Sequence, residues 1–160
     1  MRIGYGFDGH RLAPNRKLVL GGVEIDYPLG LEGHSDADVL VHAIIDALLG
    51  AAGMGDIGML FPDTDSSYKG VSSLGLLSET ITRITSCGLE VSNVDVTLLA
   101  ERPKIGPFRE QIAQNVAMAL GVPRSRVNIK ATTTEGLGFV GRQEGMAAAA
   151  VALLIETGRE

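Results

Sequence analysis

The sequence predicts an α+β fold, a single domain in which a mixed β-sheet has its helices packed on one face. The chain has 160 residues, the size of one ordinary domain, and no low-complexity linker or internal repeat divides it. Apolar residues recur with the period of strands in some segments and of helices in others. Placing all helices on one face of the sheet is the economical way to bury both kinds of apolar surface. We therefore expect one domain over residues 1–160.

The N-terminal segment predicts a strand and then a hairpin. Ile3, Tyr5 and Phe7 alternate with smaller or polar residues, which indicates a strand with one buried face. Residues 17–20 and 23–25 then flank a Gly-Gly pair, which is a typical two-residue hairpin turn.

A helix and a long loop should follow. Ser35-Asp36-Ala37-Asp38 resembles a capping box, with Asp in place of Glu or Gln, and predicts a helix from there to about Ala52. The glycine-rich residues 53–70 are long for a structureless connection, and such loops are usually functional or disordered. Three aspartates in this loop would either bind the hydroxyls of a polyol or cap turns: Asp56, Asp63 and Asp65.

Regular spacing predicts the remaining elements. Apolar residues at helical spacing indicate helices near 74–84 and 107–120, each followed by a glycine. Strict alternation indicates strands at 94–100 and 127–131. Residues 146–155 are nearly all apolar, and their alanines favour a helix. We predict instead a strand that is buried on both faces.

Composition excludes several classes of protein. The chain carries 14 Lys and Arg against 19 Asp and Glu, a formal net charge of −5 without charge blocks, which argues against binding to nucleic acid or to an anionic membrane. A single cysteine excludes an internal disulfide framework and a cysteine-rich zinc module. No apolar run reaches the roughly 18 residues of a membrane span, and the N-terminus lacks a signal-peptide hydrophobic region. We expect a cytoplasmic protein.

The histidines indicate a candidate metal site. Asp8 and His10 stand two apart on the first predicted strand, so both project from the same face. The pair could ligate a metal, or Asp8 could simply hold His10 by a hydrogen bond. The other two histidines, His34 and His42, lie within the first 42 residues. Zinc with three protein ligands and one open position fits this set. Spacing leaves open whether the third ligand is His42, His34 or Asp38.

Residues 130–135, Lys-Ala-Thr-Thr-Thr-Glu, indicate a phosphate and cation site. Consecutive hydroxyls and free backbone N–H groups after a strand suit phosphate oxygens, although threonines are also simply common in strands. Glu135 adds an oxygen ligand of the kind that magnesium takes alongside substrate phosphates. Arg142, after a glycine-rich run, offers a bidentate fork to an anion.

Together these segments resemble one family, the 2-C-methyl-D-erythritol 2,4-cyclodiphosphate synthases of the non-mevalonate isoprenoid pathway. The resemblance covers essentially the whole chain. It rests on six motifs in matched order and spacing: Gly6-Phe7-Asp8-x-His10; His34-Ser35-Asp36-x-Asp38 with His42; Gly55-Asp56-Ile57-Gly58; Phe61-Pro62-Asp63-Thr64-Asp65; Lys130 to Glu135; and Gly141-Arg142. The chain departs from the family pattern at Gly9, Gly106 and Gly136, so side-chain contacts at these positions cannot be carried over.

The resemblance implies a bacterial chorismate mutase-like two-layer sandwich that assembles as a homotrimer, with active sites between adjacent subunits. It implies zinc bound by Asp8, His10 and His42, and magnesium or manganese bound by Glu135 with substrate phosphates, Thr133 also being catalytic. Further residues are expected to contact the substrate: His34, Ser35, Asp56, Ile57, Gly58, Phe61, Asp63, Asp65, Ala100, Lys104, Ala131, Thr132 and Thr133. Phe139 and Arg142 match residues lining a cavity on the trimer axis that can hold isoprenoid diphosphates.

The activity implied is that of a phosphorus–oxygen lyase. Within 4-diphosphocytidyl-2-C-methyl-D-erythritol 2-phosphate, the 2-phosphate attacks the β-phosphorus, CMP leaves, and 2-C-methyl-D-erythritol 2,4-cyclodiphosphate remains. Two phosphates must approach each other, so metal ions are the natural source of positive charge in an acidic protein. The alternatives are a zinc-dependent nucleotide-diphosphate hydrolase and a non-catalytic trimer that binds isoprenoid diphosphates.

Overall fold

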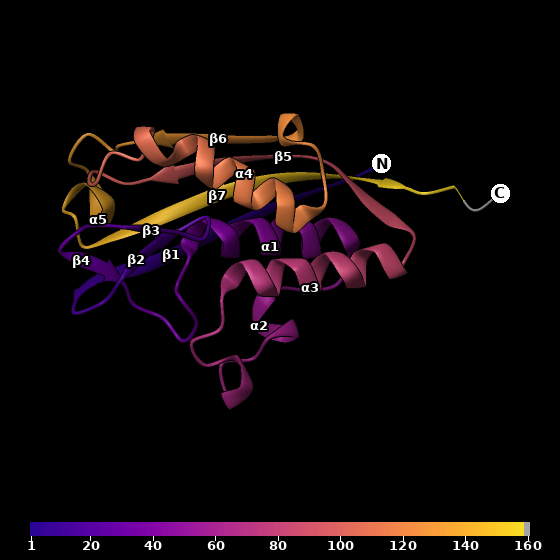
Figure 1. Ribbon diagram of the computed structural model, residues 1–160, viewed down its shortest axis with the longest axis horizontal. Coiled ribbons are helices and arrows are strands. Elements are labelled where there is room, and N and C mark those ends of the chain that lie inside the picture. The colour runs from indigo at the N-terminus through magenta and orange to yellow at the C-terminus, as the bar shows by residue number, and fades with distance from the viewer. Residues whose placement is uncertain (159–160) are drawn as a thin grey trace.

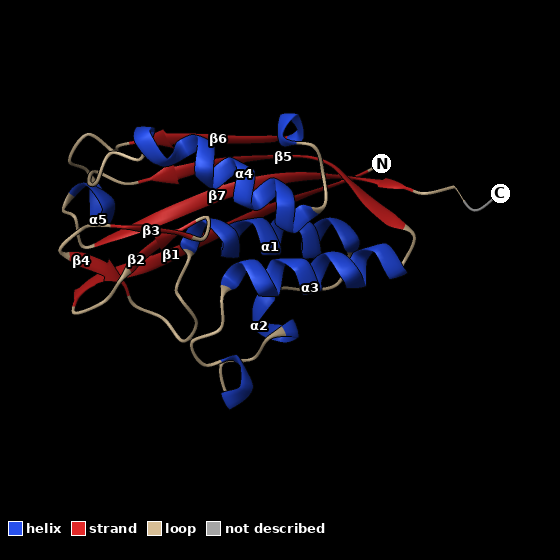
Figure 2. Ribbon diagram, in the orientation of Figure 1, coloured by secondary structure: helices blue, strands red, loops and turns tan. Residues whose placement is uncertain are grey.

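The protein has two layers, a five-stranded sheet and a layer of helices (Figures 1 and 2). The computed structural model describes residues 1–158, so residues 159 and 160 of the predicted domain lie outside the described part. One strand pair is parallel and the other three are antiparallel, which confirms a mixed sheet. Its strands, in spatial order, are β4 (Leu29–Leu31), β1 (Arg2–Pro14), β7 (Gly145–Glu156), β5 (Leu89–Leu99) and β6 (Val127–Thr132).

Three long helices form the second layer. α1 (Val39–Ala52) packs on β1 and β7, α4 (Arg109–Leu120) packs on β6, and α3 (Ser73–Ser86) lies against α1 and α4. None of the helices within residues 1–158 is long and apolar enough to cross a membrane. The remaining elements are short: the hairpin β2 (Leu18–Leu20) and β3 (Val23–Ile25), α2 (Ile57–Leu60), α5 (Gly138–Gly141), and the 3₁₀ turns η1 (Ser66–Tyr68), η2 (Gly106–Phe108) and η3 (Arg124–Arg126).

β1 turns its glycines, rather than its large apolar side chains, toward the helices. A Cβ atom on Gly4 would lie 1.9 Å from the carbonyl oxygen of Ala47, and one on Gly6 would lie 2.0 Å from that of Ala43. The backbones of α1 and β1 are therefore in direct contact. The apolar residues that suggested the buried face lie on the opposite, uncovered face and are more than half exposed in the single chain: Ile3, Tyr5 and Phe7.

The start of α1 also differs from the prediction. The N-cap is Asp38 and not Ser35: Oδ1 of Asp38 accepts the N–H of Val41 at 3.2 Å. Its Oδ2 accepts the N–H of Gly22 at 2.8 Å, so the β2–β3 turn is tied to the same cap. This long-range contact places the helix start three residues later than the local pattern indicated.

The last segment is a strand, as predicted, in spite of its alanines. β7 lies between β1 and β5, where its backbone groups pair on both sides, and this tertiary context outweighs the helix propensity of alanine. Its face toward the helices is fully buried. Burial on both faces is wrong at Val151, which is 39% exposed on the uncovered side of the sheet beside Tyr5.

The backbone contact under α1 predicts a strong dependence on glycine. Gly6→Ala should lower the free energy of unfolding by about 3 kcal/mol, toward the upper end for an overpacked core, because its Cβ would meet helix backbone. Chemical denaturation would measure it. Gly75→Ala is the matched control on α3, where nothing lies within 4 Å of the new Cβ, and should stabilise by about 0.5–1 kcal/mol. Equal effects of the two substitutions would contradict the packing described.

Candidate functional site

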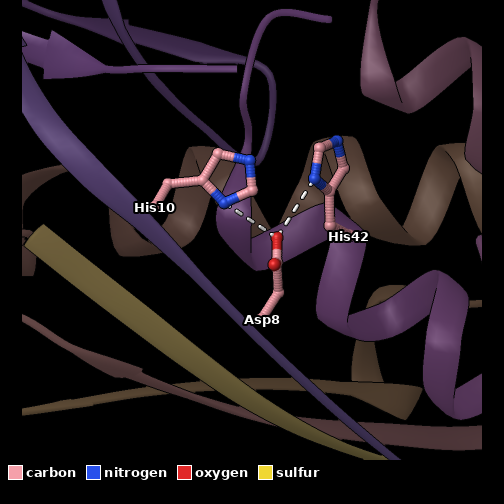
Figure 3. A group of neighbouring side chains, drawn as sticks. All are labelled: Asp8, His10 and His42. Carbon is pink, nitrogen blue, oxygen red and sulfur yellow. Dashed lines mark hydrogen bonds and ion pairs between the residues drawn. The ribbon is translucent and has the colours of Figure 1, made fainter. Parts of the chain in front are cut away.

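One carboxylate and two imidazoles meet where β1 passes the first turns of α1 (Figure 3). Oδ2 of Asp8 lies 3.1 Å from Nδ1 of His10 and 3.1 Å from Nδ1 of His42. One donor atom from each residue lies within 4.8 Å of the other two, and the side chains are only 12–25% exposed. The structure thus brings His42 to the Asp-x-His pair, whereas His34 and Asp38 are outside this group of described residues.

The donor set fits a metal ion. Nδ1 of His10 is buried and makes no hydrogen bond among the described residues, although Oδ2 of Asp8 lies 3.1 Å away. Two ligands of a tetrahedral zinc ion with bonds near 2.1 Å lie about 3.4 Å apart, close to the oxygen–nitrogen separations found here. One carboxylate and two imidazoles are ligands that zinc commonly takes, with a fourth position left open.

Electrostatics favour a cation in this group. Burial by itself raises the pKa of Asp8, but the contacts and positive charge of His10 and His42 outweigh burial and hold this pKa well below its usual range. Burial by itself lowers the pKa of His42, but Asp8, Asp38 and Asp36 raise it by more, so the pKa of His42 lies above its usual value. The carboxylate therefore stays ionised and attracts positive charge, whether a proton on an imidazole or a metal ion.

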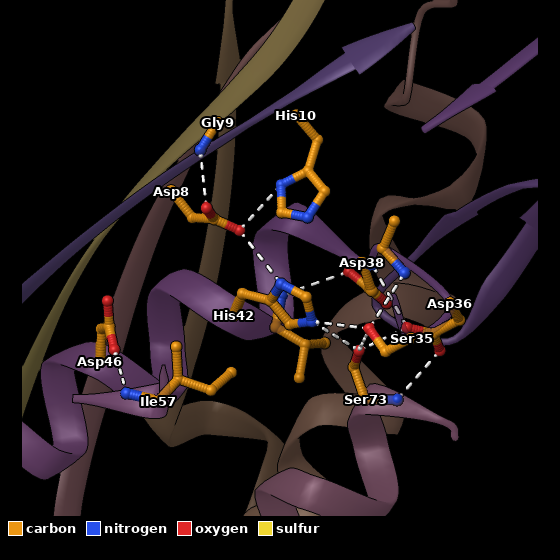
Figure 4. A network of polar contacts seen from close by, with 12 residues as sticks. Asp8, Gly9, His10, Ser35, Asp36, Asp38, His42, Asp46, Ile57 and Ser73 are labelled. Atoms are coloured by element: carbon orange, nitrogen blue, oxygen red, sulfur yellow. Dashed lines mark hydrogen bonds and ion pairs between the residues drawn. The ribbon is translucent and has the colours of Figure 1, made fainter. Parts of the chain in front are cut away.

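The far nitrogen of His42 faces hydroxyl groups (Figure 4). Nε2 lies 2.9 Å from Oγ of Ser73 and 3.1 Å from Oγ of Ser35. Oγ of Ser73 in turn donates to Oδ1 of Asp36, and the backbone N–H of Ser73 donates to Oδ2 at 3.0 Å. Sequence reasoning missed Ser73, because the contact spans 31 residues and nothing in the local pattern around Ser73 points to His42.

Asp38, one of the candidate ligands, has a structural role. It is fully buried, and both of its oxygens accept backbone N–H groups, from Val41 and Gly22. Burial raises the pKa of Asp38 to about 6, in spite of these hydrogen bonds. Its carboxylate therefore joins the start of α1 to the β2–β3 turn rather than facing the Asp8 group.

A pocket of about 380 Å³ opens beside the histidines. The Asp8, His10 and His42 group lines this pocket together with six residues that were predicted as substrate contacts: His34, Ser35, Ile57, Gly58, Phe61 and Asp63. Tyr68 and Leu76 complete the wall, and Tyr68 packs edge-on against Phe61. Most of the N-terminal motifs thus converge on one cavity.

Turn capping accounts for two of the loop aspartates. Oδ1 of Asp56 accepts the N–H of Met59 at 2.9 Å and begins α2, and Oδ1 of Asp65 accepts the N–H of Ser67 at 2.9 Å and begins η1. Asp46, one turn after His42 on α1, accepts the N–H of Ile57 at 2.8 Å. Asp46 thereby fixes the position of Ile57, a contact that the spacing of Asp46 and His42 along the helix did not indicate.

A second pocket, of about 670 Å³, lies at the carboxyl ends of β5 and β6. It contains a further group of the predicted substrate contacts and shares no lining residue with the pocket beside the histidines: Ala100, Lys104, Ala131, Thr132 and Thr133. Oγ1 of Thr133 donates to Oε1 of Glu135 at 3.0 Å, so these two residues lie together. Within one chain, most of the predicted substrate contacts are thus divided between two separate pockets.

The carboxylate of Glu101 holds the loop that carries Glu135. Oε1 of Glu101 accepts the N–H groups of Thr134 at 3.0 Å and Gly136 at 3.3 Å, on either side of Glu135. Glu135 and Gly136 both have left-handed backbone angles, φ 54° and 80°, which turn these N–H groups inward. The expectation of free N–H groups for phosphate is therefore wrong at Thr134. Glu101 was missed because it lies 33 residues from its partner.

Arg142 does not present an open fork. Its Nε and Nη2 each lie 3.1 Å from one oxygen of the exposed Glu144, in a bidentate pair that raises the pKa of Arg142. Phe139, predicted to lie near the same anion, lines a smaller pocket together with Glu144 and Gly9. In the single chain this fork is paired with a surface carboxylate, and anion binding by Arg142 stays a prediction.

The fold and the site together define an α+β domain with a candidate metal centre in the wall of an open pocket. A family profile described as the YgbB family matches residues 1–155. The chain therefore belongs to the YgbB family.

Named relatives identify the activity of this family. The chain is 59% identical over 154 residues to the 2-C-methyl-D-erythritol 2,4-cyclodiphosphate synthase of Desulfatibacillum aliphaticivorans, a match that covers 96% of this chain and 99% of the relative. The resemblance predicted from the six motifs is thus confirmed, and with it the function of a cyclodiphosphate synthase in isoprenoid biosynthesis.

Solved structures agree with the fold. A structure described as 2C-methyl-D-erythritol-2,4-cyclodiphosphate synthase, bound form CDP, matches with TM-score 0.89 and 40% identity, over 96% of this chain and all of that one. The bifunctional IspDF from Campylobacter jejuni matches with TM-score 0.93 and 45% identity, over 97% of this chain. The chain spans only 42% of that bifunctional protein.

The role of Glu101 predicts a loss of stability on truncation. Glu101→Ala should lower the free energy of unfolding by about 1–3 kcal/mol, because two inward-facing N–H groups lose their acceptor. Denaturant titration would measure it, with Glu90→Ala as a control at an exposed position of β5. A change no larger than that of the control would show that Glu101 does not hold this loop.

Proposed function

We propose that the chain cyclises 4-diphosphocytidyl-2-C-methyl-D-erythritol 2-phosphate with release of CMP, in a site that holds zinc and magnesium or manganese. A new bond forms between an oxygen of the 2-phosphate and the β-phosphorus, and the bond from that phosphorus to the CMP oxygen breaks. The single observation that carries the proposal is the Asp8, His10 and His42 group in the wall of the pocket of about 380 Å³.

Each metal has its own proposed ligands. Asp8, His10 and His42 would hold zinc, while Glu135 beside Thr133 would hold magnesium or manganese together with substrate phosphates. When bound, these ions supply the positive charge that offsets repulsion between two approaching phosphates. The chain itself contributes little such charge, since its formal net charge is −5.

The two pockets divide the substrate between them. In the pocket beside the histidines, His34 and Ser35 would bind phosphate, while Ile57, Phe61 and Asp63 would surround the methylerythritol. Asp56 and the backbone at Gly58 would bind the ribose. In the other pocket, a further set of residues would bind cytosine and the phosphates, which agrees with the CDP named for one similar structure: Ala100, Lys104, Ala131, Thr132 and Thr133. Holding the substrate at both ends would bring its phosphates into reacting geometry.

A homotrimer would join the two half-sites. The two pockets of one chain have no lining residue in common, so a subunit that faced its neighbour could complete one site with residues of both. The uncovered face of the sheet is a suitable interface, because Tyr5 and Phe7 on β1 and Val151 on β7 leave apolar surface exposed there. Isoprenoid diphosphate binding near Phe139, and a cytoplasmic location, stay predictions.

Product analysis tests the reaction. After incubation of the protein with the cytidylyl substrate, zinc and magnesium, phosphorus NMR should show equimolar CMP and a cyclic diphosphate. CMP with an open-chain diphosphate would identify the hydrolase instead. Folded, metal-loaded protein that gave no turnover would overturn the proposal and favour the binding trimer.

His42→Ala should remove bound zinc and activity together. The substitution deletes one of three protein ligands, so zinc measured by atomic absorption should fall from about one per chain to a small fraction. His34→Ala is the control: His34 lines the same pocket outside the ligand group, so this variant should keep its zinc and lose substrate affinity. Normal turnover by zinc-free His42→Ala would contradict the assignment of His42 as a zinc ligand required for activity.

Tyr5→Glu should dissociate the assembly. Tyr5 is 65% exposed on the uncovered face, and a buried charge at an apolar interface is costly. Analytical ultracentrifugation should show trimers for the unmodified chain and monomers for the variant, and activity should fall with the trimer. Met118→Glu, at a 66% exposed position on α4, should leave the assembly intact. Trimeric Tyr5→Glu, or a monomeric parent chain, would contradict this interface.

A further inference from the structure

We propose that Ser73 is a positioning residue that fixes the single proton of neutral His42 on Nε2 and so presents the Nδ1 lone pair to a metal ion. The inference rests on the metal site of the proposed function. It adds a residue outside the six motifs, contributed by α3 rather than by the elements that hold the ligands.

Ser73 lies in the protein interior and does not line the pocket beside the histidines. Its residue is fully buried, at the first position of α3. Its Oγ lies 2.9 Å from Nε2 of His42, the shortest of the contacts that Figure 4 draws to that nitrogen. Because α3 packs on α1, the position of this hydroxyl is determined by two helices in contact.

The direction of each hydrogen bond follows from counting protons. A carboxylate only accepts, so the hydroxyl proton of Ser73 is committed to Oδ1 of Asp36. The carboxylate of Asp36 is fixed in turn by the backbone N–H groups of Ser73, at 3.0 Å, and Asp38, at 3.2 Å. Oγ of Ser73 therefore has only lone pairs left to offer, and Nε2 of His42 must be the donor.

This direction has a consequence at the other side of the ring. With one proton on Nε2, neutral His42 has a bare lone pair on Nδ1, which lies 3.1 Å from Oδ2 of Asp8. Two acceptors at that distance repel each other unless a positive group lies between them. Either a proton on Nδ1 or a metal ion supplies that group, and in both cases Nε2 keeps its proton toward Ser73, so the Asp36–Ser73 pair prepares His42 to bind an ion through Nδ1.

Ser35 cannot replace Ser73 in this role. Its Oγ also lies near Nε2, at 3.1 Å, and accepts the N–H of Ala37 at 3.2 Å. Among the described residues, no carboxylate accepts a hydrogen bond from the hydroxyl of Ser35. This hydroxyl can therefore either donate to Nε2 of His42 or accept from it. Without Ser73, the ring is free to place its proton on Nδ1, where it bonds to Asp8 and opposes the metal.

The test is Ser73→Ala, read out without substrate. Zinc affinity, measured by competition with a chromophoric chelator, should weaken by about 10- to 100-fold, the usual effect of removing a residue that orients a metal ligand. Nitrogen-15 NMR of the metal-free protein, above the pH at which the ring of His42 loses its second proton, should show the Nε2–H tautomer in the parent chain. Ser73→Ala should show a substantial share of the Nδ1–H tautomer.

Two further variants make the result specific. Ser78→Ala removes an exposed hydroxyl of the same helix, bonded only to its own helix backbone, and should change neither reading. Asp36→Ala removes the acceptor of the Ser73 hydroxyl proton, which can then be donated to Nε2, and should weaken zinc binding as Ser73→Ala does. Thermal unfolding of the metal-free variants checks that they remain folded.

Unchanged zinc affinity and an unchanged tautomer in folded Ser73→Ala would overturn the proposal. An Nδ1–H tautomer in the parent chain would overturn it as well. Neither zinc affinity nor the tautomer of His42 depends on the reaction. A failure to release CMP would therefore refute the proposed function without deciding the role of Ser73.

Discussion

Direct backbone contact between β1 and α1 is the constraint on which the site depends. Gly4 and Gly6 let the helix lie so close that its carbonyl oxygens occupy the space of a Cβ. The same face of β1 continues through Asp8 and His10, and because strand side chains alternate, both project toward α1. His42 lies on the turn of α1 that passes these residues, so its ring reaches Asp8 without a bridging residue.

Buried polar groups around this contact form one connected arrangement rather than isolated pairs. Asp8 joins both histidines, and the far nitrogen of His42 leads through Ser73 to Asp36. In a weakly polar interior each such group needs a partner, since an unpaired one is costly. Among the described residues, the buried side-chain polar atom without a hydrogen bond is Nδ1 of His10, which belongs to the candidate metal-ligand group. The unpartnered nitrogen of His10 and the hydrogen-bonded polar groups around His42 thus both support a metal site at Asp8.

The predicted substrate contacts of the single chain lie in two separate pockets. The metal-ligand group and the pocket at the carboxyl ends of β5 and β6 have separate walls. The sheet face opposite the helices carries apolar side chains such as Tyr5 and Phe7. The homotrimer proposed above would account for both features, because a neighbouring copy would bury the apolar face and complete the divided site.

The sequence by itself determined the kinds of elements, the pairing of Asp8 with His10 and, through six motifs, the family, because these depend on local periodicity and on spacing along the chain. Tertiary structure decided the rest. It turned the glycines of β1 toward α1, brought His42 to Asp8, a choice that the family resemblance implied and spacing alone left open, and added Ser73 and Glu101. Those contacts join residues more than 30 positions apart, so they follow from the packing of helices on the sheet and from the loop bonded to Glu101, and no local pattern records them.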